Sequence, residues 1–128
     1  MANTILFVCK GNRYRSRIAE EIFNRHAPKG FVAESAGIQF QKWNDRATPK
    51  VLMEIGVRLT KRKPKRLTRR MLSKASKIIV FDGVKIASSA DTWPVRDCRA
   101  GDIRCIRKGR NQIERRVKAL IKSLERSA

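Results

Sequence analysis

A short apolar run near the start of the chain, residues 5–8 (ILFV), constrains the fold most strongly. Side chains alternate between the two faces of a strand, so a strand that is apolar throughout must be covered on both faces. The run ends at the turn-like segment 9–12 (CKGN), and from Ser16 the apolar residues recur at helical spacing. The sequence therefore predicts a buried strand that passes through a loop into a helix.

Further strands and helices alternate along the rest of the chain. Apolar runs predict three more strands, and amphipathic patterns predict three more helices. The strands are expected at 31–35, 77–82 and 91–95, and the helices at 49–55, 67–72 and 113–124. This alternation favours a three-layer, doubly wound α/β fold, in which a parallel sheet carries helices on both faces. The length suits one domain, and no repeat or linker interrupts residues 1–128.

In such folds, ligands bind beyond the carboxyl ends of the strands, where a strand passes into a helix. At the end of the first strand, Cys9 and Arg15 flank five residues: Lys10, Gly11, Asn12, Arg13 and Tyr14. Backbone N–H groups of such a loop can surround a phosphate dianion, and the helix dipole adds positive potential. That field favours the thiolate form of Cys9, which is the nucleophilic form. Arg15 can offer two N–H groups to the phosphoryl oxygens.

Two residues of this loop and the serine at the start of the helix fit the same interpretation. Gly11 lets the backbone approach the anion, Asn12 tolerates a left-handed conformation, and Ser16 can donate its hydroxyl to the departing sulfur. A second Cys and Arg pair with the same spacing lies at 98–104, but no apolar strand precedes it. Its Asp102 would place a carboxylate where an anion must sit, so we interpret this second pair as a coincidence.

The pattern Phe-Val-Cys-x-Gly-Asn-x-x-Arg-Ser-x-x-Ala-Glu over residues 7–20 resembles the low-molecular-weight protein tyrosine phosphatases. At 34–37 (ESAG) the likeness includes the family's serine, here Ser35, which braces the loop asparagine, here Asn12. The likeness also covers 45–47, 52–56, 65–68 and the closing helix. The resemblance implies a flavodoxin-like sheet of four parallel strands. It also implies hydrolysis of protein phosphotyrosine through a cysteinyl phosphate, with a phosphoprotein as partner and without metal or cofactor.

The resemblance also points to an acid for the leaving oxygen. In the family this acid is the Asp of an Asp-Pro pair in a late loop, and the matching residue here is Asp97. Asp91 and Asp102 are rival carboxylates nearby. Cys98 stands in place of the proline, and the tyrosines that often follow are absent.

Two departures from the family concern the cysteines. Many members carry a second cysteine inside the loop, where this chain has Tyr14, so a protective disulfide within the loop is not available. We therefore hypothesise that Cys98, beside the acid, forms a reversible disulfide with Cys9.

The wall of the pocket departs from the family as well. Arg13 stands where the family places a small or aliphatic residue, and its charge either recruits a second anion or obstructs a phosphotyrosine ring. The candidates for an aromatic wall are Phe40 and Trp43, each of which fits a core position equally well.

Other functions stay open on the same residues. Thioredoxin-linked arsenate reductases share the fold and need two further thiols, which Cys98 and Cys105 can supply, although in that family the pair precedes the acid loop. Protein arginine phosphatases are associated with a small threonine at the position of Arg13. A third alternative is a non-enzymatic protein that uses the fold to bind polyanions.

The charge of the chain supports that third alternative. The sequence has 31 Lys and Arg against 11 Asp and Glu, a formal net charge of +20, with basic groups at 58–70 and 104–118. Such groups favour an acidic partner or nucleic acid. Aromatic residues are scarce in both, which argues against a dedicated single-strand binder.

The composition of the chain also gives expectations about its location in the cell and about metal binding. No apolar stretch approaches the roughly 20 residues that cross a bilayer, and no basic leader precedes the first apolar run. Three cysteines form neither an even disulfide framework nor paired zinc knuckles. We therefore expect a cytoplasmic protein without a membrane span or a metal site.

Overall fold

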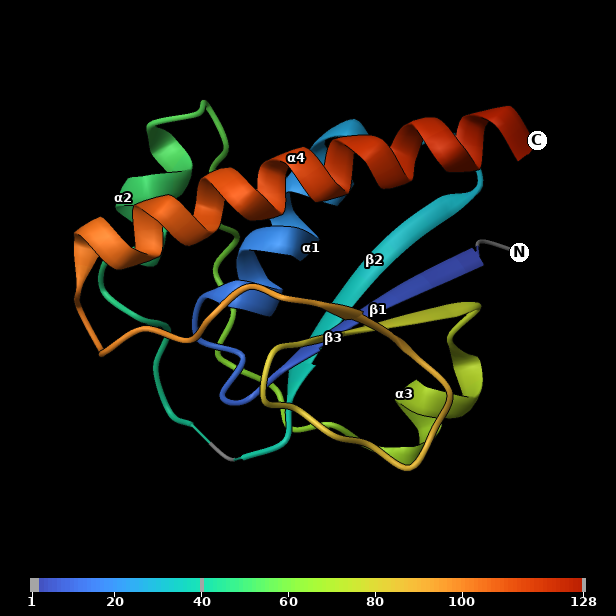
Figure 1. Ribbon diagram of the computed structural model, residues 1–128, viewed down its shortest axis with the longest axis horizontal. Helices are drawn as coiled ribbons and strands as arrows, with labels where there is room; N and C mark the ends of the chain where they lie inside the picture. Colours follow the sequence, from blue (N-terminus) through green and yellow to red (C-terminus); the bar gives the residue numbers. More distant parts are fainter. Residues whose placement is uncertain (1–2, 40, 128) are drawn as a thin grey trace.

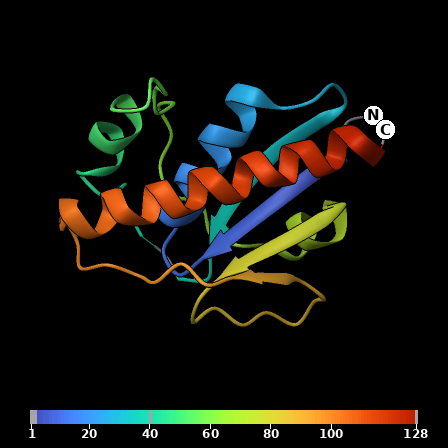
Figure 2. The same ribbon diagram turned by 45° about the horizontal axis from the view of Figure 1, so that its top comes forward.

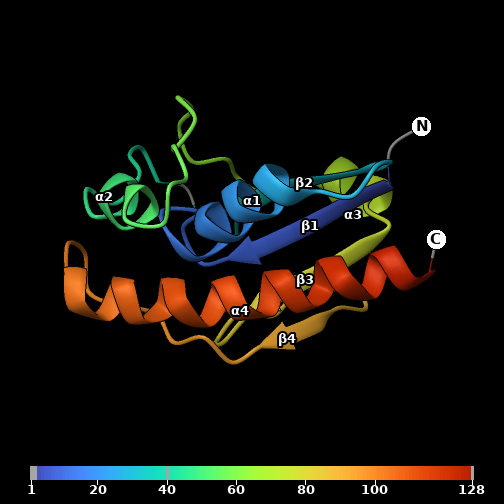
Figure 3. The ribbon, with the colours of Figure 1, turned by 90° about the horizontal axis from the view of Figure 1, so that it is seen from above.

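Four parallel strands form the central sheet, in the order β2-β1-β3-β4 (Figures 1 and 3; β4 is labelled in Figure 3). The strands are β1 (Asn3–Cys9), β2 (Phe31–Gly37), β3 (Lys77–Phe81) and β4 (Asp91–Trp93). β1 pairs with β2 along its whole length and also with β3, so the first apolar run lies in the middle of the sheet. The structure is a computed structural model that describes residues 3–39 and 41–127.

Helices cover both faces of this sheet. The helices are α1 (Arg15–His26), α2 (Thr48–Met53), α3 (Arg69–Lys74) and α4 (Ile103–Ser127). Ile5 and Phe7 of β1 pack into one core with α1, α2 and α4, whereas Leu6 and Val8 pack into a second core with α3. Successive side chains of β1 therefore point into two different cores, one on each face of the sheet. This arrangement confirms the predicted three-layer, doubly wound α/β fold with a four-stranded parallel sheet.

The longest helix, α4, runs across nearly the full length of the molecule (Figures 2 and 3). It begins at Ile103 instead of near residue 113, where the amphipathic pattern becomes clear. Its buried face in this first part includes Arg110, whose guanidinium donates to the backbone carbonyl of Val51 at 2.8 Å. Hydrogen bonds from Arg107 and then Arg110 lower the pKa of Glu54 to about 2 and tie α2 to α4.

In the part of the chain that the structure describes, no helix has the length and apolarity that a membrane crossing requires. The carboxyl ends of β1, β3 and β4 meet at one edge of the sheet, where the loop after β1 faces the segment between β4 and α4 (Figure 2). This edge holds the predicted site.

Candidate active site

The loop between β1 and α1 curls around the sulfur of Cys9. The Sγ atom accepts a hydrogen bond from the backbone N–H of Asn12 at 3.2 Å and lies 2.9 Å from Ser16 Oγ. Asn12 has a φ of 57°, in the left-handed region that the sequence predicted for it. Cys9 is buried and carries a free thiol. The loop therefore surrounds a buried free thiol where the strand passes into the helix.

The side chain of Asn12 holds this turn in place. Its Nδ2 donates to Ser16 Oγ at 2.7 Å and to Ser35 Oγ at 2.8 Å, and its Oδ1 accepts from the backbone N–H of Lys65 at 2.9 Å. Asn12, Ser16 and Ser35 have no exposed surface. Buried polar groups whose hydrogen bonds are satisfied favour one conformation, so these bonds fix the strained turn.

Arg62 completes this network, although sequence reasoning missed it. In the sequence it is one of eight cations between residues 58 and 70, and nothing sets it apart. In the structure its guanidinium donates to Ser35 Oγ at 2.6 Å, to Asn12 Oδ1 at 3.2 Å and to the carboxylate of Glu20. Burial lowers the pKa of Arg62, against the opposing effect of Glu20. This member of the basic stretch therefore supports the loop from behind.

Arg15 lies at the first position of α1 and is almost fully buried, at 2% exposed. Its Nη1 donates to the backbone carbonyls of Asp82 at 2.9 Å and of Val95 at 2.8 Å, just beyond the ends of β3 and β4. Its Nε is buried and has no hydrogen-bond partner among the described residues. A buried guanidinium that keeps a free N–H at a pocket is suited to binding an anion there.

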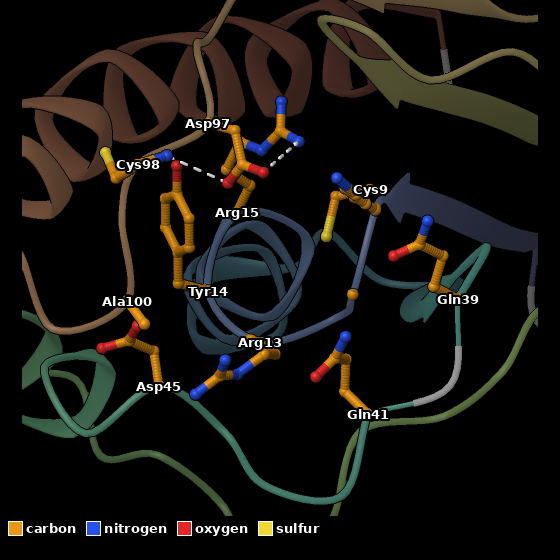
Figure 4. A pocket seen from close by; sticks show the side chains of 12 residues that line it. Cys9, Arg13, Tyr14, Arg15, Gln39, Gln41, Asp45, Asp97, Cys98 and Ala100 are labelled. Carbon is orange, nitrogen blue, oxygen red and sulfur yellow. Dashed lines mark hydrogen bonds and ion pairs between the residues drawn. The ribbon is translucent and has the colours of Figure 1, made fainter.

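Asp97 lies beside Arg15 at the mouth of the same pocket (Figure 4). Its Oδ2 is 3.8 Å from Arg15 Nη2, its Oδ1 accepts from the backbone N–H of Cys98 at 3.0 Å, and about half of its side-chain surface is exposed. The two rival carboxylates lie elsewhere. Asp91 pairs with Lys77 at 2.7 Å, and Asp102 accepts from a backbone N–H at the start of α4. Of these three carboxylates, the structure brings only Asp97 to Cys9 and Arg15.

The pocket has a volume of about 220 Å³. Lys10, Gly11, Arg13 and Tyr14 of the loop also line it, together with Gln39, Gln41, Asp45 and Cys98 (Figure 4). Among the described residues, no cluster of three His, Cys, Asp or Glu side chains could hold a metal ion.

The structure describes only one of the two candidates for an aromatic wall, Trp43. Trp43 does not line the pocket and is 61% exposed; its backbone carbonyl accepts from Arg13 Nε at 3.0 Å. Phe40 lies outside the described residues. Among the described residues that line the pocket, the aromatic ring is that of Tyr14, whose hydroxyl donates to the backbone carbonyl of Arg96 at 2.9 Å. Burial raises the pKa of Tyr14 far above its usual range, so this hydroxyl stays neutral.

The cysteines also pair differently from our hypothesis. A reversible disulfide between Cys9 and Cys98 stays a hypothesis, but this structure does not contain that bond, because Cys98 forms a disulfide with Cys105 and Cys9 is free. The reason is the early start of α4 at Ile103. Its first turn places Cys105 beside Cys98, with 5.9 Å between the two Cα atoms, which is within the range of a disulfide. The sequence pattern put this helix later, although Cys98 and Cys105 are the two thiols that the arsenate reductase alternative required.

A sequence model of the family described as low molecular weight phosphotyrosine protein phosphatase matches residues 4–91. The chain belongs to this family. The match spans the loop after β1, Ser35 and the first three strands, and it confirms the resemblance found in the sequence. It ends at residue 91 and does not include Asp97.

Solved structures of this fold include enzymes with several activities. The chain is 27% identical to an arsenate reductase from Archaeoglobus fulgidus, with a TM-score of 0.78 over 92% of this chain and 98% of that one. It superposes on the YwlE arginine phosphatase from Geobacillus stearothermophilus with a TM-score of 0.83 at 20% identity, over 98% and 94% of the two chains. The tyrosine phosphatase AmsI from Erwinia amylovora gives 0.82 at 22% identity, over 96% and 93%.

Proposed function

We propose that this member of the family is a protein tyrosine phosphatase that works through a cysteinyl-phosphate intermediate. The observation that carries the proposal is the convergence of the free Cys9 sulfur, the Arg15 guanidinium and the Asp97 carboxyl group on one pocket. A nucleophile, an anion-binding cation and a proton donor are the three groups that hydrolysis of a phosphate monoester requires in the absence of a metal.

In the first step, the Cys9 sulfur attacks phosphorus and the phosphate ester bond breaks. Loop N–H groups and the Arg15 guanidinium hold the phosphoryl oxygens, whose charge persists through the transition state. Asp97, protonated at the start, gives its proton to the tyrosyl oxygen as it leaves. The products of this step are the dephosphorylated tyrosine residue of the substrate protein and a phosphate bonded to the Cys9 sulfur.

In the second step, water attacks phosphorus and Asp97, now a carboxylate, accepts its proton. The sulfur–phosphorus bond breaks and the electron pair returns to Cys9. Ser16 Oγ, 2.9 Å from the sulfur, is placed to donate a hydrogen bond to the departing sulfur. Inorganic phosphate then leaves, and the pocket returns to its initial state.

A substrate panel tests this proposal. We expect hydrolysis of p-nitrophenyl phosphate and of a phosphotyrosine peptide in the presence of a metal chelator, measured by p-nitrophenolate absorbance and by released phosphate. A phosphoserine peptide of the same sequence should react far more slowly, because its phosphate sits on a shorter side chain and the Cys9 sulfur is buried. A faster reaction with a phosphoarginine peptide would contradict the assignment to tyrosine, and inactivity on every ester would contradict a phosphatase.

The Cys98–Cys105 disulfide favours a second candidate function, thiol-dependent reduction of arsenate. Cys9 would bond to arsenic and release water, and the Cys98 thiolate would then attack the Cys9 sulfur. The electron pair of the sulfur–arsenic bond would pass to As(V), which leaves as arsenite, As(III), while a Cys9–Cys98 disulfide forms. Attack by Cys105 on Cys98 would free Cys9 and leave the disulfide present in this structure. A dithiol reductant such as thioredoxin would then regenerate the pair.

Substitution of Cys105 by serine distinguishes the two activities. We expect C105S to lose repeated turnover of arsenate with thioredoxin and to accumulate a Cys9–Cys98 disulfide, detectable by mass spectrometry of non-reduced peptides. Hydrolysis of p-nitrophenyl phosphate should continue at the wild-type rate, because Cys105 does not line the pocket. If the wild-type protein does not reduce arsenate, the second function is wrong and the first is unaffected.

A further inference from the structure

Six cations stand in one line along the outer side of α4. An α-helix has 3.6 residues per turn, so positions spaced by three or four residues lie on the same side of it. Starting from Arg104, the positions at +4, +7, +11, +14, +18 and +22 all point to within about 40° of the direction of Arg104. We call this set the α4 stripe: Arg104, Lys108, Asn111, Arg115, Lys118, Lys122 and Arg126. With a rise of 1.5 Å per residue, the stripe is about 33 Å long.

The α4 stripe faces solvent along its whole length. All seven side chains are exposed, because the opposite face of α4 supplies Ile106, Ile113 and Val117 to the core. Within the described part of the chain, only Lys118 of the six cations has a carboxylate partner, Glu114 at 3.3 Å. The other five charges are not neutralised by the protein itself.

A hollow beside the stripe adds a second basic feature. It has a volume of about 350 Å³ and lies between α4 and the residue after β4, lined by Pro94, Gln112, Arg115, Arg116 and Ala119. No carboxylate lines it, and neither arginine forms an ion pair among the described residues. Arg115 belongs to both the hollow and the stripe, so the two form one continuous basic surface.

We propose that this surface binds double-stranded nucleic acid through its phosphate backbone. A duplex presents one negative charge per roughly 1.7 Å of its axis, so the cations of the stripe that have no carboxylate partner among the described residues would face a high density of phosphate charge. The stripe is about as long as one helical turn of a duplex, roughly 34 Å. The absence of acidic and aromatic side chains from the stripe predicts contacts to phosphate without base stacking or sequence readout.

An anionic membrane is a weaker match for the same charges. Amphipathic helices that bind bilayers insert an apolar face, and the apolar face of α4 is already buried in the core. The α4 surface does not include the catalytic pocket, because no residue of the stripe or the hollow lines that pocket. Nucleic-acid binding is therefore independent of the proposed phosphatase activity.

Two triple variants that remove equal charge test the proposal. The stripe variant is K108Q/R115Q/K122Q, and the control is R58Q/K61Q/K63Q, whose three residues are also exposed but lie in the other basic group. Binding of a fluorescently labelled DNA duplex is followed by anisotropy over a series of salt concentrations. Circular dichroism, and hydrolysis of p-nitrophenyl phosphate if the wild type has it, verify folding.

We expect the wild type to bind the duplex with a steep salt dependence. The stripe variant should bind about tenfold more weakly or worse at low salt, and its slope of log K against log salt should fall by about 3, one for each lost phosphate contact. The control should retain the wild-type slope. Equal losses in both variants would show that net charge alone acts, and would overturn the proposal. Preferential binding to phosphatidylserine vesicles or to poly-glutamate in competition would overturn it as well.

Discussion

Replacement of Cys9 by serine is expected to abolish hydrolysis of phosphate esters while phosphate binding remains. A serine hydroxyl is a far weaker nucleophile than a thiolate, and no base adjoins this position to activate it, since its neighbours are Ser16 and the Asn12 amide. We expect kcat for p-nitrophenyl phosphate to fall by roughly 10⁴-fold or more. The loop N–H groups and Arg15 are unchanged, so inorganic phosphate or vanadate should still bind, as measured by calorimetry.

Cys105→Ser is the matched control for this prediction, because it makes the same substitution outside the pocket and should retain hydrolysis. Rapid quenching of the wild type with labelled phosphotyrosine peptide should trap phosphate on the peptide that contains Cys9, and C9S should trap none. Activity of C9S near the wild-type level would remove Cys9 as the nucleophile and the two-step mechanism with it.

Much of the fold follows from features that are local in the sequence. Residues 5–8 are apolar throughout because the strand lies between two helical layers, and this pattern is visible without knowing what covers it. The first part of α4 was not predicted, because its buried side does not show an apolar pattern in the sequence. Its buried side includes Gly109 and Arg110, a small residue and a cation. Neither residue type is typical of a core. The burial of Arg110 is explained only by its acceptors in the folded protein, the Val51 carbonyl and the Glu54 carboxylate.

The candidate site also has a part that local sequence features predict and a part that only the tertiary structure reveals. Cys9, Asn12, Arg15 and Ser16 lie within eight residues, so strand, loop and helix together predict their convergence. The groups that hold Arg15 are the backbone carbonyls of residues 82 and 95, and any residue type can supply a carbonyl. Arg62 was hidden among like charges, and the Cys98–Cys105 bond depends on where α4 begins. Such contacts arise from tertiary structure and leave no pattern in the sequence.

Replacement of Asp97 by asparagine is expected to slow turnover by an amount that depends on the leaving group. Asparagine keeps the shape and the hydrogen bond from the Cys98 N–H but has no acidic proton. General acid catalysis contributes about 10²- to 10⁴-fold, so kcat for phenyl phosphate should fall within that range. The loss should be smaller for p-nitrophenyl phosphate, because p-nitrophenolate is a stable anion that leaves with less need of a proton.

The same substitution at the rival carboxylate, Asp102→Asn, controls for changes in charge at this end of the molecule. Asp102 caps the start of α4 through its side-chain oxygen, which asparagine also supplies, so D102N should retain full activity on both esters. Iodoacetate should modify Cys9 in D97N as it does in the wild type, because the loop around the sulfur is unchanged. An equal loss on both esters in D97N would assign Asp97 a role in holding Arg15, 3.8 Å away, instead of a role in proton transfer. A loss of activity in D102N alone would indicate that Asp102, just before α4, is the proton donor.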